Sequence, residues 1–346
     1  MAILNFDTNS IGLADNNIFG LPTNEENARL ILLPIPWEVT VSYRNGTARG
    51  PEKIKEASYQ IDLCDPDARH AWEAGYFMPE LDKGIIKKND FLRHCAELII
   101  SNLSEGGNTE DNTQLHDKLE QINQGCRELN QWIYEQAKAY YAKGKMVALV
   151  GGDHSTPFGL IKAAGEQFGS FGILQIDAHA DLRPSYEGFT YSHASIMYNV
   201  LQEVPQVEKL VQVGVRDFCD QEYELICSDK RIHTFFDKDL KEKQYDGSTW
   251  RALCDEIIAE LPQQVYISFD IDGLEPSLCP NTGTPVPGGL SYEAVEFLFD
   301  QLVESGRQII GFDLVEMTPG DDEWDANVGA RVLYQLFGYA TQSRQK

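Results

Sequence analysis

The sequence predicts one α/β domain over residues 1–346, in which helices cover both faces of a doubly wound, mostly parallel sheet. Two patterns support this fold. Short apolar runs rich in β-branched residues recur along the chain, which is typical of strands buried on both faces of a parallel sheet. From Lys145 onward these runs alternate with helical patterns, and no linker rich in proline, glycine or serine separates them.

The N-terminal part is expected to contain fewer elements with longer connections. Residues 1–27 are interpreted as an N-terminal extension, and the apolar residues 28–35 predict the first strand. A helix is expected over residues 51–62, because a proline suits its first turn. Another helix is expected over residues 89–103, with Asn89 as its N-cap.

A polar stretch and a long amphipathic helix follow. Residues 101–114 are polar and contain glycine, so we expect an exposed loop. Apolar residues then recur at three- and four-residue steps from Leu115 to Tyr140, which predicts an amphipathic helix that ends near Gly144. Further strands are expected at residues 146–150, 172–176, 209–215, 233–236, 265–269 and 308–312. Further helices are expected at residues 157–167, 195–203, 248–261, 291–306 and 326–341.

Composition limits the classes of partner. The formal net charge of -25 disfavours binding to nucleic acid or to an anionic membrane and suits a small cationic ligand. The seven cysteines are scattered and never form Cys-x-x-Cys, which argues against a zinc finger and for a reducing compartment. The first residues lack the pattern of a signal peptide, and no apolar run is long enough to span a membrane. We therefore expect a cytoplasmic protein.

The most informative stretch runs from residue 175 to residue 183, Gln-Ile-Asp-Ala-His-Ala-Asp-Leu-Arg. It places Asp177, His179 and Asp181 at alternate positions directly after an apolar run. If that run is a buried strand, the three side chains leave its carboxyl end together. A solvated loop would explain a single motif of this kind equally well.

Three other apolar runs also end in acidic residues or histidine. His154 follows residues 147–150, Asp270 and Asp272 follow residues 265–269, and Asp313 and Glu316 follow residues 308–312. In parallel α/β sheets, ligands bind outside the carboxyl ends of the strands. The four strand ends are therefore expected to converge on one site.

The chemistry of the expected site favours divalent cations. Its donors are His154, Asp177, His179, Asp181, Asp270 and Asp272. Four carboxylates at one point repel each other unless cations are present. An oxygen-rich set with two imidazoles and no thiolate favours Mn²⁺ over structural zinc, although Ni²⁺, Co²⁺ and Fe²⁺ also suit these ligands. Two such ions activate a hydroxide for hydrolysis. The acidic surroundings favour a cationic substrate over a phosphate ester.

Four motifs resemble the signatures of the ureohydrolases, the arginase and agmatinase family. They are Gly-Gly-Asp-His-Ser at residues 151–155, Asp-Ala-His-Ala-Asp at 177–181, Ser-Phe-Asp-Ile-Asp-Gly-Leu-Glu-Pro at 268–276 and Asp-Leu-Val-Glu at 313–316. The resemblance implies an arginase-like fold, a homo-oligomer (trimer or hexamer) and two Mn²⁺ ions bridged by Asp177 and Asp270. It also implies that a hydroxide between the ions attacks a guanidinium carbon and releases urea and an amine.

The resemblance also implies roles for two residues outside the ligand set. Glu316 matches the carboxylate that pairs with the guanidinium, and His193 matches the histidine that passes protons to the leaving amine. Taken alone, Glu316 could equally be a strand-end salt bridge, and His193 a loop histidine at a helix start. Asp153 is interpreted as a hydrogen-bonding neighbour of the site. The remaining histidines are expected at the surface or in packing: His70, His94, His116 and His233.

The expected substrate is a small guanidino compound. Arginases follow the central motif with an asparagine that helps to bind the amino-acid head, whereas this chain has Leu182 and Arg183. The Tyr-Ser-His-Ala segment at residues 191–194 is similar to that of agmatinases, so agmatine, cleaved to putrescine and urea, is the first choice. Because Arg183 could accept a carboxylate, formimidoylglutamate remains an alternative. The segments 101–113 and 320–324 differ from a compact agmatinase and could reshape the pocket, so guanidinobutyrate, arginine and free guanidine also remain alternatives.

Two rival classes fit parts of the pattern. A non-catalytic regulator that binds a metal or an amine would keep the scaffold but not the activity. A deacetylase-type hydrolase shares the fold but needs one zinc ion with an open position, whereas this chain offers ligands for a second ion. The complete donor set favours the binuclear hydrolase.

Overall fold

A single parallel sheet organises the structure, a computed structural model that describes residues 6–9, 13, 16–64, 66 and 70–344. Within those residues the sheet has eight strands in the order β2-β1-β3-β8-β7-β4-β5-β6, and all their pairings are parallel. The strands are β1 (Leu30–Ile35), β2 (Tyr76–Phe77), β3 (Met146–Gly151), β4 (Phe171–Ile176), β5 (Val207–Val213), β6 (Ile232–Phe235), β7 (Gln264–Asp270) and β8 (Gln308–Val315). The predicted parallel α/β fold is confirmed.

The strand order brings the four acidic strand ends together. β3, β8, β7 and β4 are consecutive neighbours in the middle of the sheet. Their residues are buried almost throughout, which explains why their sequences read as continuous apolar runs rather than as alternating patterns. Because the strands are parallel, their carboxyl ends lie at one edge of the sheet.

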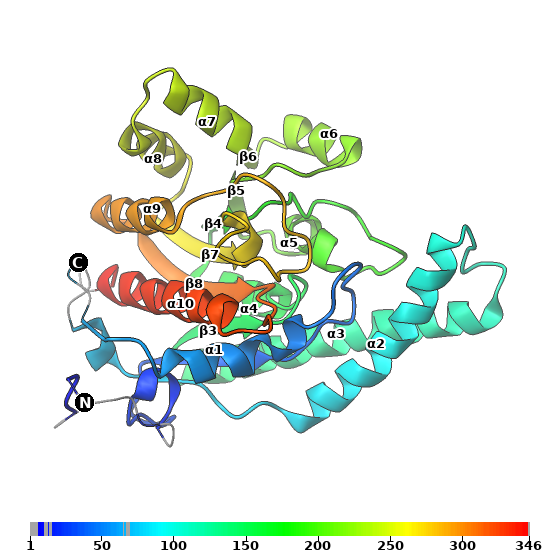
Figure 1. The fold of residues 1–346 in the computed structure, drawn as a ribbon, viewed down its shortest axis with the longest axis horizontal. Helices are drawn as coiled ribbons and strands as arrows, with labels where there is room; N and C mark the ends of the chain where they lie inside the picture. The colour runs from blue at the N-terminus through cyan, green and yellow to red at the C-terminus, as the bar shows by residue number, and fades with distance from the viewer. Residues whose placement is uncertain (1–5, 10–12, 14–15, 65, 67–69, 345–346) are drawn as a thin grey trace.

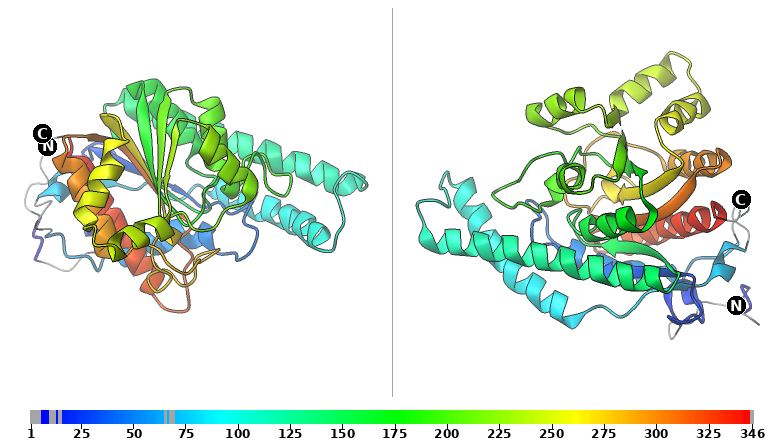
Figure 2. Two further views of the ribbon diagram at one scale, coloured as in Figure 1. Left: turned by 90° about the horizontal axis from the view of Figure 1, so that it is seen from above. Right: turned by 180° about the vertical axis from the view of Figure 1, so that it is seen from behind.

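Helices cover both faces of the sheet, as the doubly wound prediction requires (Figures 1 and 2). Alternate strand residues point into two hydrophobic clusters: Leu32 and Val150 into one, and Ile31 and Leu149 into the other. The first cluster is closed by α1 (Gly50–Ser58), α8 (Trp250–Ala259), α9 (Tyr292–Glu304) and α10 (Trp324–Gln342). The second is closed by α2 (Lys83–Ser104), α3 (Thr113–Ala142), α4 (Phe158–Phe168) and α5 (Ile196–Glu203).

The helices α2 and α3 form a long pair whose connected ends project from the body of the molecule (Figures 1 and 2). The prediction that Asn89 caps α2 is wrong. Asp82 caps the helix by accepting hydrogen bonds from the backbone N–H groups of Gly84 and Ile85. Asn89 lies inside the helix and accepts from the backbone N–H of Glu38. Its side chain therefore ties α2 to the loop after β1.

The expected loop at residues 101–114 is shorter in the structure. Residues 105–112 connect the helices and are mostly exposed, whereas the flanking residues belong to the last turn of α2 and the first turn of α3. Asn112 caps α3 by accepting from the backbone N–H groups of Gln114 and Leu115. The polar side chains at both ends were read as loop because an exposed helix end has the same composition.

Among the described strands and α-helices, three short ones were not predicted: β2, α6 (Asp220–Ser228) and α7 (Asp237–Tyr245). The last of these has the sequence DKDLKEKQY, in which only Leu240 is a buried apolar residue, so no helical periodicity was visible. Part of the segment interpreted as an extension packs into the core, since Ile18 and Phe19 are buried. Residues 1–5, 10–12 and 14–15 of that segment lie outside the described residues. Among the helices described, none has the length and apolar character needed to cross a membrane.

Candidate metal centre

The loop after β3 carries His154 to the centre of the carboxyl edge. Its first residue beyond the strand, Gly152, passes so close to the preceding loop that a Cβ there would lie 1.8 Å from the Trp37 carbonyl oxygen. Only glycine permits this approach. The backbone N–H of His154 then donates to Glu316 Oε1 at 2.8 Å, and the backbone N–H of Glu316 donates to the Gly152 carbonyl at 2.8 Å. The two strand ends are thus joined directly.

A buried chain of hydrogen bonds fixes the His154 ring from behind. Its Nε2 lies 2.9 Å from the Ser268 hydroxyl, which in turn donates to Asp313 Oδ1 at 3.0 Å. Because the serine has a single hydrogen and gives it to the carboxylate, it accepts from Nε2–H of the imidazole. In the neutral ring, Nδ1 therefore carries the lone pair, which is the arrangement of a metal-binding histidine.

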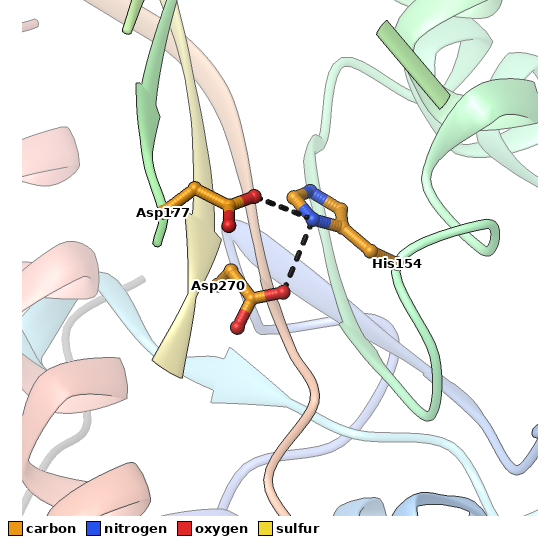
Figure 3. A group of neighbouring side chains, drawn as sticks. All are labelled: His154, Asp177 and Asp270. Carbon is orange, nitrogen blue, oxygen red and sulfur yellow. Dashed lines mark ion pairs between the residues drawn. The ribbon is translucent and has the colours of Figure 1, made fainter. Parts of the chain in front are cut away.

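Three carboxylates surround that nitrogen. His154 Nδ1 lies 3.0 Å from Asp177 Oδ2, 3.0 Å from Asp181 Oδ2 and 3.2 Å from Asp270 Oδ2. Figure 3 shows Asp177, Asp270 and His154 pointing toward one another from three different segments. Among the described residues, Nδ1 nevertheless has no partner with the geometry of a hydrogen bond. The four atoms converge as ligands around a common point do.

A second donor group lies beside the first and shares Asp177 with it. His179 Nδ1 is 3.0 Å from Asp272 Oδ2 and 3.6 Å from Asp177 Oδ1. Within the described part of the chain, the sets of His154, Asp177 and Asp270 and of Asp177, His179 and Asp272 each bring ligand atoms close enough together to hold an ion. The structure therefore brings together all six donors expected from the sequence.

Backbone and amide donors orient the carboxylates. Asp177 accepts from the backbone N–H of His179 at 2.6 Å and from the Gln175 side-chain amide at 2.7 Å. Asp272 Oδ1 accepts from the backbone N–H of Ala178 at 3.0 Å. Asp270 Oδ1 accepts from the backbone N–H of Asp272 at 2.8 Å. These bonds orient three of the four carboxylates, and in Asp270 and Asp272 they leave Oδ2 toward a histidine.

The protonation equilibria show that the site needs positive charge. Burial, together with the Asp177 carboxylate, raises the pKa of Asp181 to about 7. Burial and two neighbouring carboxylates raise the pKa of Asp270 well above its usual value. Burial disfavours the charged forms of His154 and His179, but the surrounding carboxylates outweigh it and raise both pKa values. Divalent cations would supply the charge that protons otherwise bring, so the donor set fits metal ions.

A pocket of about 160 Å³ opens onto these donors. Glu316 lines it and has an unusual backbone, with φ of 63°. Burial and the nearby Asp153 carboxylate raise the pKa of Glu316 well above its usual value. A buried carboxylate in this state is suited to pairing with a cation in the pocket.

His193 lines the same pocket at the start of a short 3₁₀ helix, His193–Ser195. Its backbone N–H donates to the Thr40 hydroxyl at 3.1 Å, and the ring of Tyr186 meets its ring edge-on at 6.0 Å. Burial, with the positive charges of nearby histidines, lowers the pKa of His193 to about 4. The ring is therefore neutral at pH 7 and able to accept a proton.

Thr40 is a site residue that the sequence reasoning missed. Its hydroxyl and backbone N–H donate to Asp153 Oδ2 at 3.0 and 3.2 Å, while Ser155 binds the other oxygen of that carboxylate. Through Thr40, Asp153 thus connects the loop that carries His154 to the backbone of His193, as expected for a hydrogen-bonding neighbour. An isolated threonine in an apolar stretch gives no sequence signal for this role.

The other histidines lie away from the donors, as predicted. The exposed positions are His70, His94, His116 and His233. His70 forms an ion pair with Glu73 at 3.0 Å, and His233 with Glu260 at 3.4 Å. Both ion pairs lie away from the donor groups.

The architecture is that of solved ureohydrolases. The agmatine ureohydrolase of Thermoplasma volcanium superposes with a TM-score of 0.68 at 20% identity, covering 93% of each chain. Arginase from Bacillus cereus superposes with a TM-score of 0.64 at 22% identity, covering 89% of this chain and 98% of that one. At these identities the likeness establishes the arginase fold.

Sequence comparison places the chain within a family. The arginase family model matches residues 28–338, and the chain therefore belongs to the arginase family. It is 32% identical over 319 residues to an N(1)-aminopropylagmatine ureohydrolase of Thermus thermophilus, covering 91% of this chain and 92% of that one. It is 26% identical over 349 residues to the agmatinase of Cronobacter sakazakii, covering 96% and 95%. The chain is an agmatinase-like ureohydrolase, a hydrolase of carbon–nitrogen bonds in amidines.

Proposed function

We propose that the chain hydrolyses a guanidino-alkylamine, agmatine in the first instance, to urea and the corresponding amine at a pair of Mn²⁺ ions. The observation that carries the proposal is the pair of donor groups that share Asp177, with Glu316 and His193 on the same pocket. Ligands for one ion would be His154, Asp177, Asp181 and Asp270. Ligands for the other would be Asp177, His179, Asp270 and Asp272.

Divalent ions at these positions, when bound, offset the buried negative charge and activate water for attack on the guanidinium carbon. The oxygen-rich donor set favours Mn²⁺, and Ni²⁺ or Co²⁺ would suit the same ligands. The chain supplies much of the orientation, because backbone or amide donors already hold the carboxylates of Asp177, Asp270 and Asp272. Such preorganisation lowers the cost of reaching the reactive geometry.

Glu316 would bind the guanidinium of the substrate. One of its oxygens accepts from the backbone N–H of His154, which fixes the carboxylate next to the first donor group. A planar guanidinium can offer parallel N–H groups to a carboxylate, and a simple ammonium cannot. The negative charge of Glu316 is disfavoured by burial, so pairing with a cationic substrate would stabilise it.

His193 would accept and return the proton that must reach the leaving amine. Its neutral state at pH 7 leaves a ring nitrogen free to take up a proton during the reaction. The contact between its backbone N–H and the hydroxyl of Thr40 holds the residue at the pocket wall. The Ser192 hydroxyl lies 3.4 Å from its Nδ1, where it can influence which ring nitrogen is protonated.

The surroundings of Arg183 favour a substrate without a carboxylate. Its guanidinium stacks over Tyr186 at 4.8 Å, and its Nε lies 3.6 Å from Glu222 Oε2. The charge of Arg183 is therefore already engaged within the protein. The pocket lining also includes the exposed Asp217, which would repel the carboxylate of arginine or guanidinobutyrate and attract an amine.

A second candidate substrate is N(1)-aminopropylagmatine. The relatives from Thermus thermophilus and Synechocystis that carry this name are 32% and 31% identical to the chain, whereas the agmatinases of Cronobacter sakazakii and Neisseria meningitidis are 26% and 28% identical. The exposed carboxylate of Asp217 at the pocket wall would suit the additional ammonium group of this longer compound.

A urea-release assay with metal-loaded protein tests the proposal. The panel contains agmatine, N(1)-aminopropylagmatine, arginine, guanidinobutyrate, formimidoylglutamate and guanidine, each with Mn²⁺, Ni²⁺ or Co²⁺. We expect kcat/KM for the first two compounds to exceed that for the carboxylate compounds by at least about 100-fold. The reason is that the carboxylate of those substrates would be buried in the pocket without a partner. The ratio between the first two identifies the substrate.

The same experiment separates the rival classes. If two ions bind and amines bind without any turnover, the chain is a binding protein rather than a hydrolase. If a single tightly held zinc ion is recovered and only amide substrates are cleaved, the deacetylase-type chemistry applies instead. Preference for arginine or guanidinobutyrate would contradict the argument from Arg183 and the acidic pocket wall.

A further inference from the structure

Arg216 lies outside every motif of the sequence analysis but directly beside the second donor group. It follows β5, where Gly214 adopts φ of 99° and turns the chain across the carboxyl edge of the sheet. The backbone N–H of Arg216 donates to the Ala178 carbonyl at 2.8 Å. Ala178 lies between Asp177 and His179, two residues of that donor group.

The guanidinium of Arg216 binds backbone carbonyls rather than a substrate. Nη2 donates to Asp272 O at 2.7 Å and Leu274 O at 3.1 Å, and Nη1 to Gly214 O at 2.9 Å, with Gly273 O at 3.5 Å. Nε and Nη2 both approach Val286 O, at 3.2 and 3.1 Å. One side chain therefore joins the end of β5, the segment after β7 and the loop before α9.

A planar guanidinium is required for this set of contacts. Arginine offers five N–H groups in a fixed plane, whereas lysine offers three on a flexible stem. Two successive glycines leave room for the plane. A Cβ on Gly289 would lie 2.9 Å from Nη2 of Arg216 and 2.6 Å from the Leu274 carbonyl, and one on Gly288 would lie 3.2 Å from Cδ of Arg216.

The contacts of Arg216 fall unequally on the two donor groups. Its shortest bond is to the carbonyl of Asp272, whose side chain belongs only to the group with Asp177 and His179. The segment Ile271–Gly273 is a single 3₁₀ turn, too short to hold its own position by internal hydrogen bonds. His154 and Asp181, which would bind only the first ion, come from the loops after β3 and β4, whereas the shared ligand Asp270 directly precedes the turn that Arg216 holds.

We propose that Arg216 is a positioning residue that holds the Asp272 turn in place and thereby sets the metal affinity of the Asp177–His179–Asp272 group selectively. The inference rests on the proposed function only in taking the two donor groups as metal sites. Residues that do not bind the metal but orient one of its ligands typically change the metal affinity by about 10- to 100-fold when they are replaced.

The test compares Arg216→Lys with Arg231→Lys in chelator-stripped full-length protein. Arg231 is the matched control, because it also binds a backbone carbonyl, that of Leu201, but pairs with Asp229 in the turn between α6 and β6. Mn²⁺ binding is measured by calorimetry and by the magnetic-resonance signal of the exchange-coupled ion pair. We expect Arg216→Lys to weaken one of two sites by about 10-fold or more and to lose the coupled signal. Arg231→Lys should keep both.

A second pair of variants covers the case in which Arg216→Lys does not fold. Gly289→Ala keeps the arginine but places a Cβ against both its guanidinium and the Leu274 carbonyl that the guanidinium binds, and Gly306→Ala is the control. Both glycines have positive φ, 102° and 81°, but a Cβ on Gly306 would meet no described atom within 4 Å. The pair therefore separates disruption of the contact between Arg216 and the Leu274 carbonyl from the strain of a side chain at positive φ.

Each outcome bears on one hypothesis. Two wild-type-like sites in Arg216→Lys and in Gly289→Ala would overturn the positioning role, as would equal weakening of both sites. Wild-type protein that binds fewer than two ions would overturn it as well. Selective weakening without hydrolysis of any guanidino compound by the wild type would support the role of Arg216 and refute the proposed function.

Discussion

At the residue scale, Glu316 combines a strained backbone with a central position. Its φ of 63° is uncommon for a residue with a side chain and costs about 1–3 kcal/mol. Its backbone N–H donates to Gly152, and its carbonyl accepts from the Thr282 hydroxyl at 2.9 Å. These bonds keep the residue in a conformation that directs its carboxylate to the pocket and to the backbone N–H of His154.

Glu316→Gln tests this role. The amide keeps the shape of the side chain but loses the charge that would pair with a guanidinium, so we expect kcat/KM for the guanidino substrate to fall by about 10- to 100-fold. Mn²⁺ stoichiometry, measured on the same protein, should remain two per chain. Glu110→Gln, in the exposed loop between α2 and α3, is the control. Unchanged kcat/KM in Glu316→Gln would show that another group binds the guanidinium.

At the element scale, the projecting pair of helices supports the loops around the pocket. On α2, the buried Arg93 donates to the carbonyls of Val39 and Val41, which flank Thr40. On α3, the Asn123 side chain donates to the Gly188 carbonyl at 3.2 Å and accepts from the backbone N–H of Thr190 at 2.9 Å. Side chains of α2 and α3 thus hold the loop that contains Thr40 and the loop that leads to His193.

Asn123→Ala should loosen the loop that carries His193. The change leaves a backbone donor and an acceptor without their partner, which costs about 1–3 kcal/mol. Misplacement of the pocket wall should lower kcat by about 10-fold or more. Mn²⁺ affinity should stay within about 2-fold, since no donor residue moves. Gln121→Ala, on an exposed position of the same helix, is the control. Equal kcat values in the two variants would refute the role of the helix.

Local patterns predicted the main elements well and their ends less well. The strands expected at 146–150, 172–176 and 265–269 differ from the observed ones by at most one residue at either end. The predicted N-cap of α2 was displaced by seven residues, because Asn89 and Asp82 are both plausible caps and only the hydrogen bond between Asn89 and Glu38 distinguishes them. Helices without a buried apolar face could not be recognised, since their sequence lacks periodicity.

At the scale of the whole molecule, the protein concentrates buried acidic groups within a chain of net charge -25. Acids whose pKa is raised in the folded state bind more protons folded than unfolded, so they favour folding less as pH rises. Asp181, with a pKa raised to about 7, and Asp270 act in this direction. His154 and His179, with raised pKa values, also stabilise the fold mainly at low pH. The lowered pKa of Asp177 acts only below about pH 4.

Metal removal should therefore make stability strongly dependent on pH. Between pH 5 and pH 8 we expect the Tm of chelator-treated protein to fall, and Mn²⁺ to restore it most at pH 8. Each kcal/mol shifts Tm by about 2 °C in a chain of this size, so the difference should be readily measured by calorimetry. Equal Tm values of the metal-free protein across this range would show that the raised pKa values of the buried acids do not affect its stability.

The sequence by itself determined the parallel α/β class and the six candidate donors. It could do so because buried strands have a local signature and the carboxyl ends of parallel strands meet at one edge. Only the tertiary structure decided that β3, β8, β7 and β4 are neighbours, and that Thr40, Asn123 and Arg216 support the site. Their partners lie tens of residues away in the chain. Such contacts depend on the paths of the loops in space, which local residue patterns do not encode.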